Sequence, residues 1–113
     1  MHELSLCEGI LQIFESEAEK QNFKKIKMVW LEIGELSSVD INAMLFCFDV
    51  VMQNSIAENA KLEIIKIAGT AWCIQCNQSV KIKNRFDECP QCGSSQIQVT
   101  GGEEMKIKEL EVD

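Results

Sequence analysis

The chain has 113 residues, 46% of them hydrophobic, and a formal net charge of −7. That length supports one modest hydrophobic core with a small satellite. The negative charge opposes binding to nucleic acid through phosphate contacts, and no apolar run reaches the roughly 18 residues that a membrane span requires. The N-terminal segment lacks the basic and apolar regions of a signal peptide. The sequence therefore predicts a cytoplasmic protein that binds neither nucleic acid nor membrane.

Residues 3–21 have the pattern of an amphipathic helix, with apolar side chains recurring at three- and four-residue steps. Cys7 lies in the apolar stripe, and because cysteine is often buried we interpret it as a core residue rather than a ligand. Residues 25–34 follow as a strand with apolar side chains on both faces. Such a pattern predicts a central strand, or one covered on both sides.

A second helix is predicted at residues 40–53, after a turn in which Ser37-x-x-Asp40 fits a capping box. We interpret Met44 and Met52 as core residues rather than soft-metal ligands, because methionine adapts well to irregular cores. The apolar face is wide, which indicates a mostly buried helix. Its members are Ile41, Met44, Leu45, Phe46, Cys47, Phe48, Val50, Val51 and Met52.

Two further strands are predicted at residues 61–68 and 104–112, on either side of a cysteine-rich segment. The expected fold is α+β, with a small mixed three-stranded sheet packed with two helices. The first domain, of α/β type, would comprise residues 1–69 and 98–113. Residues 70–97 would form an inserted four-cysteine domain of the zinc-ribbon or rubredoxin-knuckle type, with a short strand between its cysteine pairs.

Two Cys-x-x-Cys pairs, Cys73/Cys76 and Cys89/Cys92, stand in this segment. The spacing lets both thiolates of a turn point at one centre about 2.3 Å from each sulfur, and two turns complete a tetrahedral zinc site. Two disulfides in a secreted domain, a redox-active pair and an iron site are the alternatives. Zinc is favoured because no export signal is present and a reducing compartment opposes disulfides.

Two other classes of protein share such a cysteine pattern. A zinc-ribbon regulator that binds nucleic acid or protein would be favoured by a basic face on the ribbon, and the net charge of −7 does not support it. A rubredoxin-like electron carrier would hold iron and be coloured. An enzyme is not expected, because His2 is the only histidine and no Ser/His/Asp or Cys/His set can form.

His2 is a second candidate metal ligand, although a frayed terminal residue is the simpler interpretation. It stands at the start of the first predicted helix, where backbone N–H groups have no intrahelical acceptor. Imidazole, the Met1 amine and amide nitrogens in one plane suit Ni²⁺ or Cu²⁺. Glu3 and Asp40 could add oxygen donors if the two helix starts lie together.

The sequence resembles the HypA/HybF family of hydrogenase maturation factors, which are nickel metallochaperones. The resemblance runs from Met1 to Asp113 and combines the terminal Met-His-Glu with the two cysteine pairs. The segments that carry it are Met-His-Glu-Leu-Ser-Leu-Cys at 1–7, Val-Trp-Leu-Glu-Ile-Gly-Glu-Leu-Ser at 29–37, Cys-Phe-Asp at 47–49, Ala-Lys-Leu-Glu-Ile at 60–64, Trp-Cys-Ile-Gln-Cys at 72–76 and Cys-Pro-Gln-Cys-Gly at 89–93.

The resemblance implies that His2 is the essential nickel ligand, with nearby backbone nitrogens including that of Glu3, and that Asp40 completes or flanks the site. It implies a structural zinc on the four cysteines and makes the first domain the nickel-binding one. Delivery would be to the large-subunit precursor of a [NiFe]-hydrogenase, with a nickel-handling GTPase accessory protein as collaborator. Urease accessory proteins are further possible partners, and both a monomer and a homodimer remain open. Histidines that some relatives carry beside the cysteine pairs are absent here.

Overall fold

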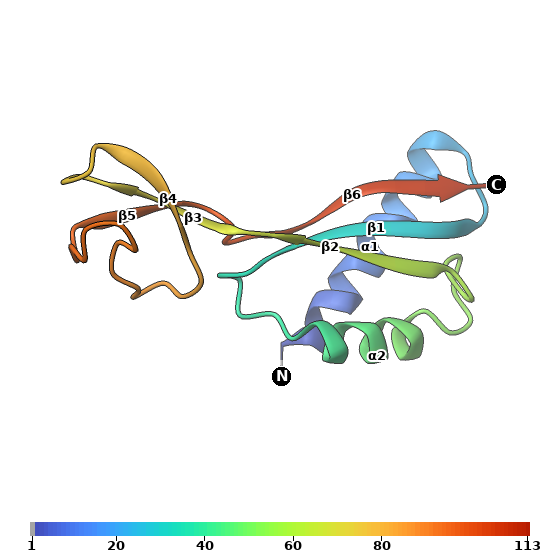
Figure 1. Ribbon diagram of the computed structural model, residues 1–113. Helices are drawn as coiled ribbons and strands as arrows, with labels where there is room; N and C mark the ends of the chain where they lie inside the picture. Colours follow the sequence, from blue (N-terminus) through green and yellow to red (C-terminus); the bar gives the residue numbers. More distant parts are fainter. Residues whose placement is uncertain (1) are drawn as a thin grey trace. The chain divides into compact units, whose positions relative to one another are not determined.

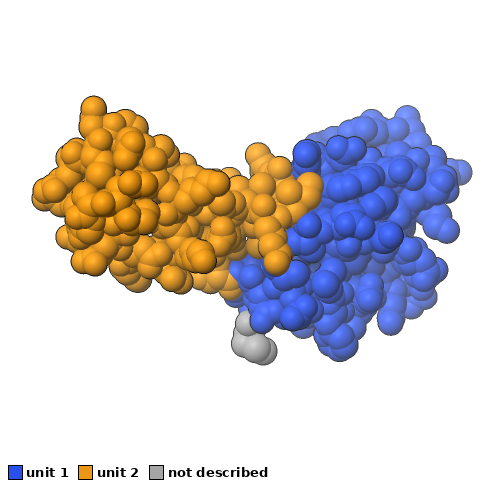
Figure 2. Space-filling view, in the orientation of Figure 1, with its two compact units in different colours: residues 1–31, 39–64, 107–113 blue, residues 32–38, 65–106 orange. Residues whose placement is uncertain are grey.

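A computed structural model describes residues 2–113, which divide into two compact units (Figure 2). Unit 1 comprises residues 2–31, 39–64 and 107–113. Unit 2 comprises residues 32–38 and 65–106. The cysteine pairs therefore belong to unit 2, whereas His2 belongs to unit 1.

Helix α1 spans Glu3–Gln21, as predicted, and ends where Asn22 adopts a left-handed conformation with φ 59°. Asparagine tolerates this conformation better than most residues, so it terminates the helix at low cost. Cys7 and Phe14 are fully buried, which confirms the assignment of Cys7 to the core. Neither helix within residues 2–113 has the length and hydropathy to cross a bilayer.

Helix α2 spans Ile41–Val51 and begins after Asp40, whose carboxylate accepts a hydrogen bond from the N–H of Ala43 at 3.0 Å. The predicted capping box is therefore wrong in detail. Asp40 itself is the cap, and the hydroxyl of Ser37 instead donates to the carbonyl of Gly34 at 2.7 Å. An Asp three residues before a free N–H satisfies that donor directly.

The two helices pack against each other in unit 1 (Figure 1). The rings of Phe14 and Phe48 meet edge to face with centroids 6.4 Å apart, and the sulfur atoms of Cys7 and Met44 lie 4.0 Å apart. Met44 and Met52 are buried, as predicted. The expectation of a mostly buried α2 is wrong, however, because Phe46 and Val50 are 71% and 46% exposed.

The first sheet has strand order β2-β1-β6, so that β1 is central, as its apolar faces predicted (Figure 1). Its strands are β1 Ile26–Gly34, β2 Lys61–Ile67 and β6 Met105–Val112. The N–H of Gly34 donates to the carbonyl of Glu104 at 2.9 Å, so β6 enters beside the end of β1 and runs antiparallel to it. The N–H of Glu35 donates to the carbonyl of Ile67 at 2.8 Å, so β1 and β2 end together and are parallel. The sheet is mixed, as expected.

Unit 2 contains a second three-stranded sheet, of order β4-β3-β5, in which both pairings are antiparallel. Its strands are β3 Gly69–Cys73, β4 Gln78–Ile82 and β5 Ile97–Gly101. Ala71 lies opposite Val80 on one side and Val99 on the other. This register places small and β-branched side chains on the face that carries the cysteines, and it matches the predicted strand between the cysteine pairs.

Candidate metal centre

Each cysteine pair stands on a turn with the same backbone construction. The N–H of Asn77 donates to the carbonyl of Cys73 at 2.8 Å, and the N–H of Gly93 donates to that of Cys89 at 2.8 Å. Asn77 and Gly93 both adopt left-handed conformations, with φ 55° and 75°. The role of Asn77 was not identified from the sequence. The residue type could have indicated this role, because asparagine tolerates the left-handed region of φ/ψ space better than most residues.

The two turns bring all four cysteine sulfurs within 4.8 Å of one another. The sulfurs of Cys73 and Cys92 are 3.6 Å apart, and those of Cys76 and Cys89 are 3.8 Å apart. Four sulfurs bound tetrahedrally at about 2.3 Å from one ion lie about 3.8 Å from each other. The residues present therefore fit a tetrahedral Zn²⁺ ion, and the four predicted ligands are brought together.

Backbone N–H groups point at two of the sulfurs. The N–H of Cys76 donates to the sulfur of Cys73 at 3.3 Å, and that of Gln91 to the sulfur of Cys89 at 3.4 Å. Burial would raise the pKa of Cys89, but the backbone N–H groups of Cys92 and Gln91 outweigh it and lower the pKa to about 7. The neighbouring sulfur of Cys92 instead raises the pKa of Cys76 to about 12. Because thiolate is the form of cysteine that binds metal, a cation bound here would displace the remaining thiol protons.

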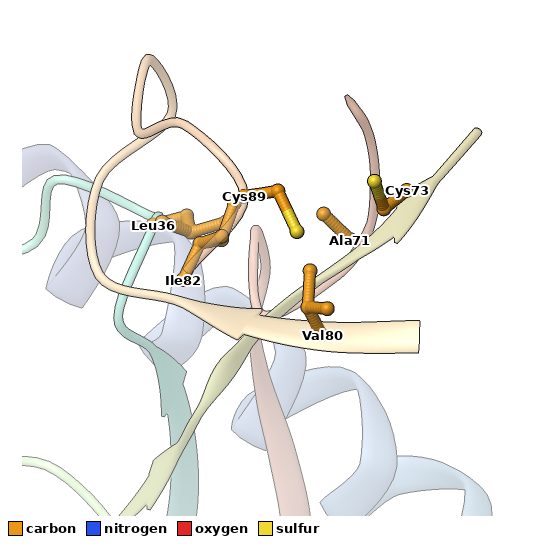
Figure 3. Close-up of a cluster of buried hydrophobic side chains, with 6 residues drawn as sticks. All are labelled: Leu36, Ala71, Cys73, Val80, Ile82 and Cys89. Carbon is orange, nitrogen blue, oxygen red and sulfur yellow. The ribbon is translucent and has the colours of Figure 1, made fainter. Parts of the chain in front are cut away.

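Half of the cluster is embedded in the core of unit 2 (Figure 3). Cys73 and Cys89 are buried, whereas Cys92 is exposed. The apolar side chains around the buried pair are Leu36, Ala71, Val80 and Ile82. Leu36 was not anticipated, because its position in a turn after β1 gives no local indication of this contact. A metal here would organise the core as well as close the turns.

The three residues predicted around nickel lie at the starts of the two helices. His2 precedes α1 as its N-cap and is exposed; within the described residues its side chain makes no capping hydrogen bond. The carboxylate of Glu3 is buried and accepts a hydrogen bond from the backbone N–H of Asp40 at 3.1 Å. The helix starts therefore meet, as the sequence interpretation required. The Met1 amine lies outside the described residues.

The Glu3 contact has a measurable pH dependence. Chiefly because of the hydrogen bond from the backbone of Asp40, the pKa of Glu3 falls from 4.5 to about 2. Its ionised form therefore stabilises the fold above pH 4.5, and this contribution is lost as the pH falls towards 2. In Glu3→Gln, we expect a lower free energy of unfolding at neutral pH and a difference from the native chain that vanishes near pH 2.

Urea unfolding followed by far-UV circular dichroism measures this difference, because both helices belong to unit 1. Glu8→Gln is the matched control, since Glu8 is exposed on the same helix. An unchanged pH dependence in Glu3→Gln would contradict the stabilising role of the carboxylate.

A four-thiol cluster on paired turns, joined to a two-helix α/β unit, defines a small metal-binding protein. Comparisons with known proteins narrow this class. The chain matches the family described as "Hydrogenase/urease nickel incorporation, metallochaperone, hypA" over residues 1–112, and it belongs to that HypA family. The description of the family names a metallochaperone and not a catalytic activity.

Individual relatives and solved structures agree with this placement. Hydrogenase maturation factors HypA from Bradyrhizobium sp. ORS 278 and Rhodopseudomonas palustris BisA53 are 57% and 53% identical to the chain over 113 residues, which is the full length of both partners. The solution structure of the nickel metallochaperone HypA from Helicobacter pylori is 27% identical, with a TM-score of 0.70 over 99% of this chain and 97% of that one. A second HypA solution structure gives a TM-score of 0.72 at 28% identity, over 99% and 96% of the two chains.

Proposed function

We propose that this protein is a nickel metallochaperone that binds Ni²⁺ through His2 and delivers it to the large-subunit precursor of a [NiFe]-hydrogenase. The observation that carries the proposal is the family match over residues 1–112 in a chain that has His2 at the start of α1. In this proposal the four cysteines hold a Zn²⁺ ion with a structural role, supported by the spacing of their sulfurs.

The helix starts supply suitable nitrogen and oxygen donors for the cargo. The backbone N–H groups of the first turn of α1 have no intrahelical acceptor, so a metal can take an amide nitrogen there without breaking the helix. The imidazole of His2 and the amide nitrogen of Glu3 would lie in the plane that Ni²⁺ prefers. The carboxylate of Glu3 is occupied by Asp40, so we assign the side chain of Glu3 a positioning role. The side chain of Asp40 would flank the site.

The rest of the proposal concerns domains, partners and compartment. Residues 1–69 and 98–113 would act as the nickel-binding domain, and residues 70–97 as the zinc-binding domain, in the cytoplasm. The collaborators would be a nickel-handling GTPase accessory protein and, where urease is served, urease accessory proteins. The maturation role of the family supports partners of this kind.

Nickel titration of three variants tests the proposed ligands. We expect His2→Ala to lose nickel affinity about 100-fold or more, because loss of a ligand costs at least as much as loss of a supporting contact. Glu3→Pro removes the amide N–H at the first helical position, where proline is tolerated, and should also lose nickel. Glu3→Ala keeps that amide and is the matched control, since both variants lack the carboxylate.

The readouts are the affinity from calorimetry and the visible absorption band of planar Ni²⁺. Zinc content and far-UV circular dichroism should match the native chain in all three variants. Unchanged nickel affinity in His2→Ala would refute the site. Equal affinities for Glu3→Pro and Glu3→Ala would exclude the amide nitrogen as a ligand.

A further inference from the structure

An open groove of about 700 Å³ runs between α1 and α2 in unit 1. Its floor and walls combine aliphatic and acidic side chains, at helical spacing along α1. The residues that line it are Leu4, Glu8, Leu11, Gln12, Glu15, Val50 and Val51. The groove belongs to a single compact unit, so its shape depends only on the packing of these two helices.

Several apolar side chains at or near the groove are only partly covered by the fold. Leu4 and Val50 are each 46% exposed, and Phe46 is 71% exposed. Phe46 and Val50 are four residues apart on α2 and therefore neighbours on its outer surface. The opposite side of α2 already provides Met44 and Phe48 to the core. An exposed Phe one helical turn from Val50, which lines the groove, is typical of a protein-binding surface.

The charge around the groove has one sign. Residues 2–19 and 35–60 contain no Lys or Arg, so basic side chains are absent from the groove and from both helices except at Lys20. Glu8 and Glu15 lie within the groove. Asp49, which precedes Val50 in α2, is also acidic and exposed, although it lines a different pocket. A ligand for this surface must be apolar in its centre and basic at its edges.

We propose that the groove between α1 and α2 binds an amphipathic helix of a partner protein, with Lys or Arg flanking its apolar face. A helix laid between two helices fills such a groove by packing its apolar stripe against theirs. A second copy of this chain fits less well, because Glu8 and Glu15 of one copy would approach acidic residues of the other. An anionic lipid surface is disfavoured by the same charges.

The location of the groove gives the docking a consequence for metal transfer. Leu4 and Glu8 stand in the first turns of α1, so a helix bound there lies beside His2. A partner held in this way could exchange nickel without the metal leaving the protein surface. The docking itself does not depend on the nickel proposal, because no groove residue is one of the proposed ligands.

Designed peptides and the full chain provide the test. The probe is a fluorescein-labelled peptide of Leu and Lys patterned as an amphipathic helix. A peptide of the same composition with a scrambled pattern and a Leu/Glu peptide serve as reference probes. We expect saturable binding, measured by fluorescence anisotropy, for the patterned Leu/Lys peptide alone. Affinity should fall as salt is raised, and amide shifts in NMR spectra should centre on the groove.

Two pairs of variants separate groove binding from general attraction. Phe46→Ser should weaken binding at least tenfold. Phe86→Ser is the matched control and should leave binding unchanged, because Phe86 is also an exposed Phe but belongs to unit 2. Glu8→Lys combined with Glu15→Lys should weaken binding at least tenfold, whereas Glu111→Lys should change it little. His2→Ala should bind the peptide normally while losing nickel affinity. The peptide assay and the nickel titration therefore test the groove proposal and the nickel proposal separately.

Several outcomes would overturn the inference. Equal binding of patterned and scrambled peptides, or equal effects of Phe46→Ser and Phe86→Ser, would show attraction to net charge only. Amide shift changes that lie far from the groove would exclude the groove as the binding site. These shifts are recorded on the native chain, so this test does not depend on whether a variant folds. Self-association in sedimentation that Phe46→Ser abolishes would identify a second copy as the occupant.

Discussion

A chain in which Cys73 is replaced by serine is expected to lose its capacity to bind zinc at the four-cysteine cluster, together with the folded structure of unit 2. Cys73 is fully buried, and its sulfur lies 3.6 Å from that of Cys92 within the four-cysteine cluster. The buried core of unit 2 is small and consists partly of the ligands themselves. Structural zinc contributes about 10–16 kcal/mol to the folding of such units, far more than their apolar contacts can replace.

Metal analysis and amide NMR spectra measure this result. The native chain should hold one zinc, and Cys73→Ser should hold none, with the amides of β3, β4 and β5 collapsed to narrow dispersion. Cys47→Ser is the matched control, because Cys47 lies in α2 outside the cluster. A Cys73→Ser chain that retains zinc and a dispersed spectrum would show that three thiolates suffice and that the fourth is dispensable.

The second large effect is expected from Gly34→Ala, at the end of β1. A Cβ atom at this position would lie 2.1 Å from the carbonyl oxygen of Gly102, which is backbone and cannot move aside like a flexible side chain. The adjacent N–H of Leu36 also donates to that carbonyl at 2.8 Å, so any displacement breaks a hydrogen bond. We expect destabilisation on the order of 3 kcal/mol or more, which is characteristic of backbone overpacking.

The same substitution at Gly9, Gly9→Ala, is expected to stabilise the fold. Gly9 lies within α1, and a Cβ there would meet nothing within 4 Å. Alanine is favoured over glycine in helices by about 1 kcal/mol, so this variant should unfold at a higher temperature than the native chain. Thermal unfolding of both variants measures the contrast. Comparable stability of Gly34→Ala and the native chain would mean that β1 and the Gly102 turn separate at little cost.

Features with local chemical causes could be predicted from the sequence. The bounds of α1 follow from its periodicity, and the central position of β1 follows from its apolar character on both faces. The four-cysteine cluster could be predicted because the spacing within each pair dictates a turn. Each of these features is determined by a short stretch of sequence, and tertiary packing did not override that local preference.

Features that depend on distant contacts could not be predicted. The outer face of α2 resembles its buried face in composition, so Phe46 was assigned to the core although it is exposed. Leu36 joins the cysteine core from a turn more than thirty residues away in the sequence. The buried carboxylate of Glu3 was considered a possible ligand, yet it bonds the backbone of Asp40. In each case the role of the residue depends on which distant part of the chain it contacts or leaves uncovered, and the local sequence pattern does not show this.

In the proposed function one small chain handles two different metals, and the spacing of the cysteine sulfurs bears on how they would be kept apart. Thiolates attract Ni²⁺ as well as Zn²⁺, and affinity alone would not keep the cargo out of the cysteine cluster. The paired turns hold Cys73 near Cys92 and Cys76 near Cys89 at almost equal distances. Both separations are close to the tetrahedral edge of about 3.8 Å that zinc requires. In the proposed function, a zinc-filled cysteine cluster would leave Ni²⁺ to the nitrogen donors at the start of α1.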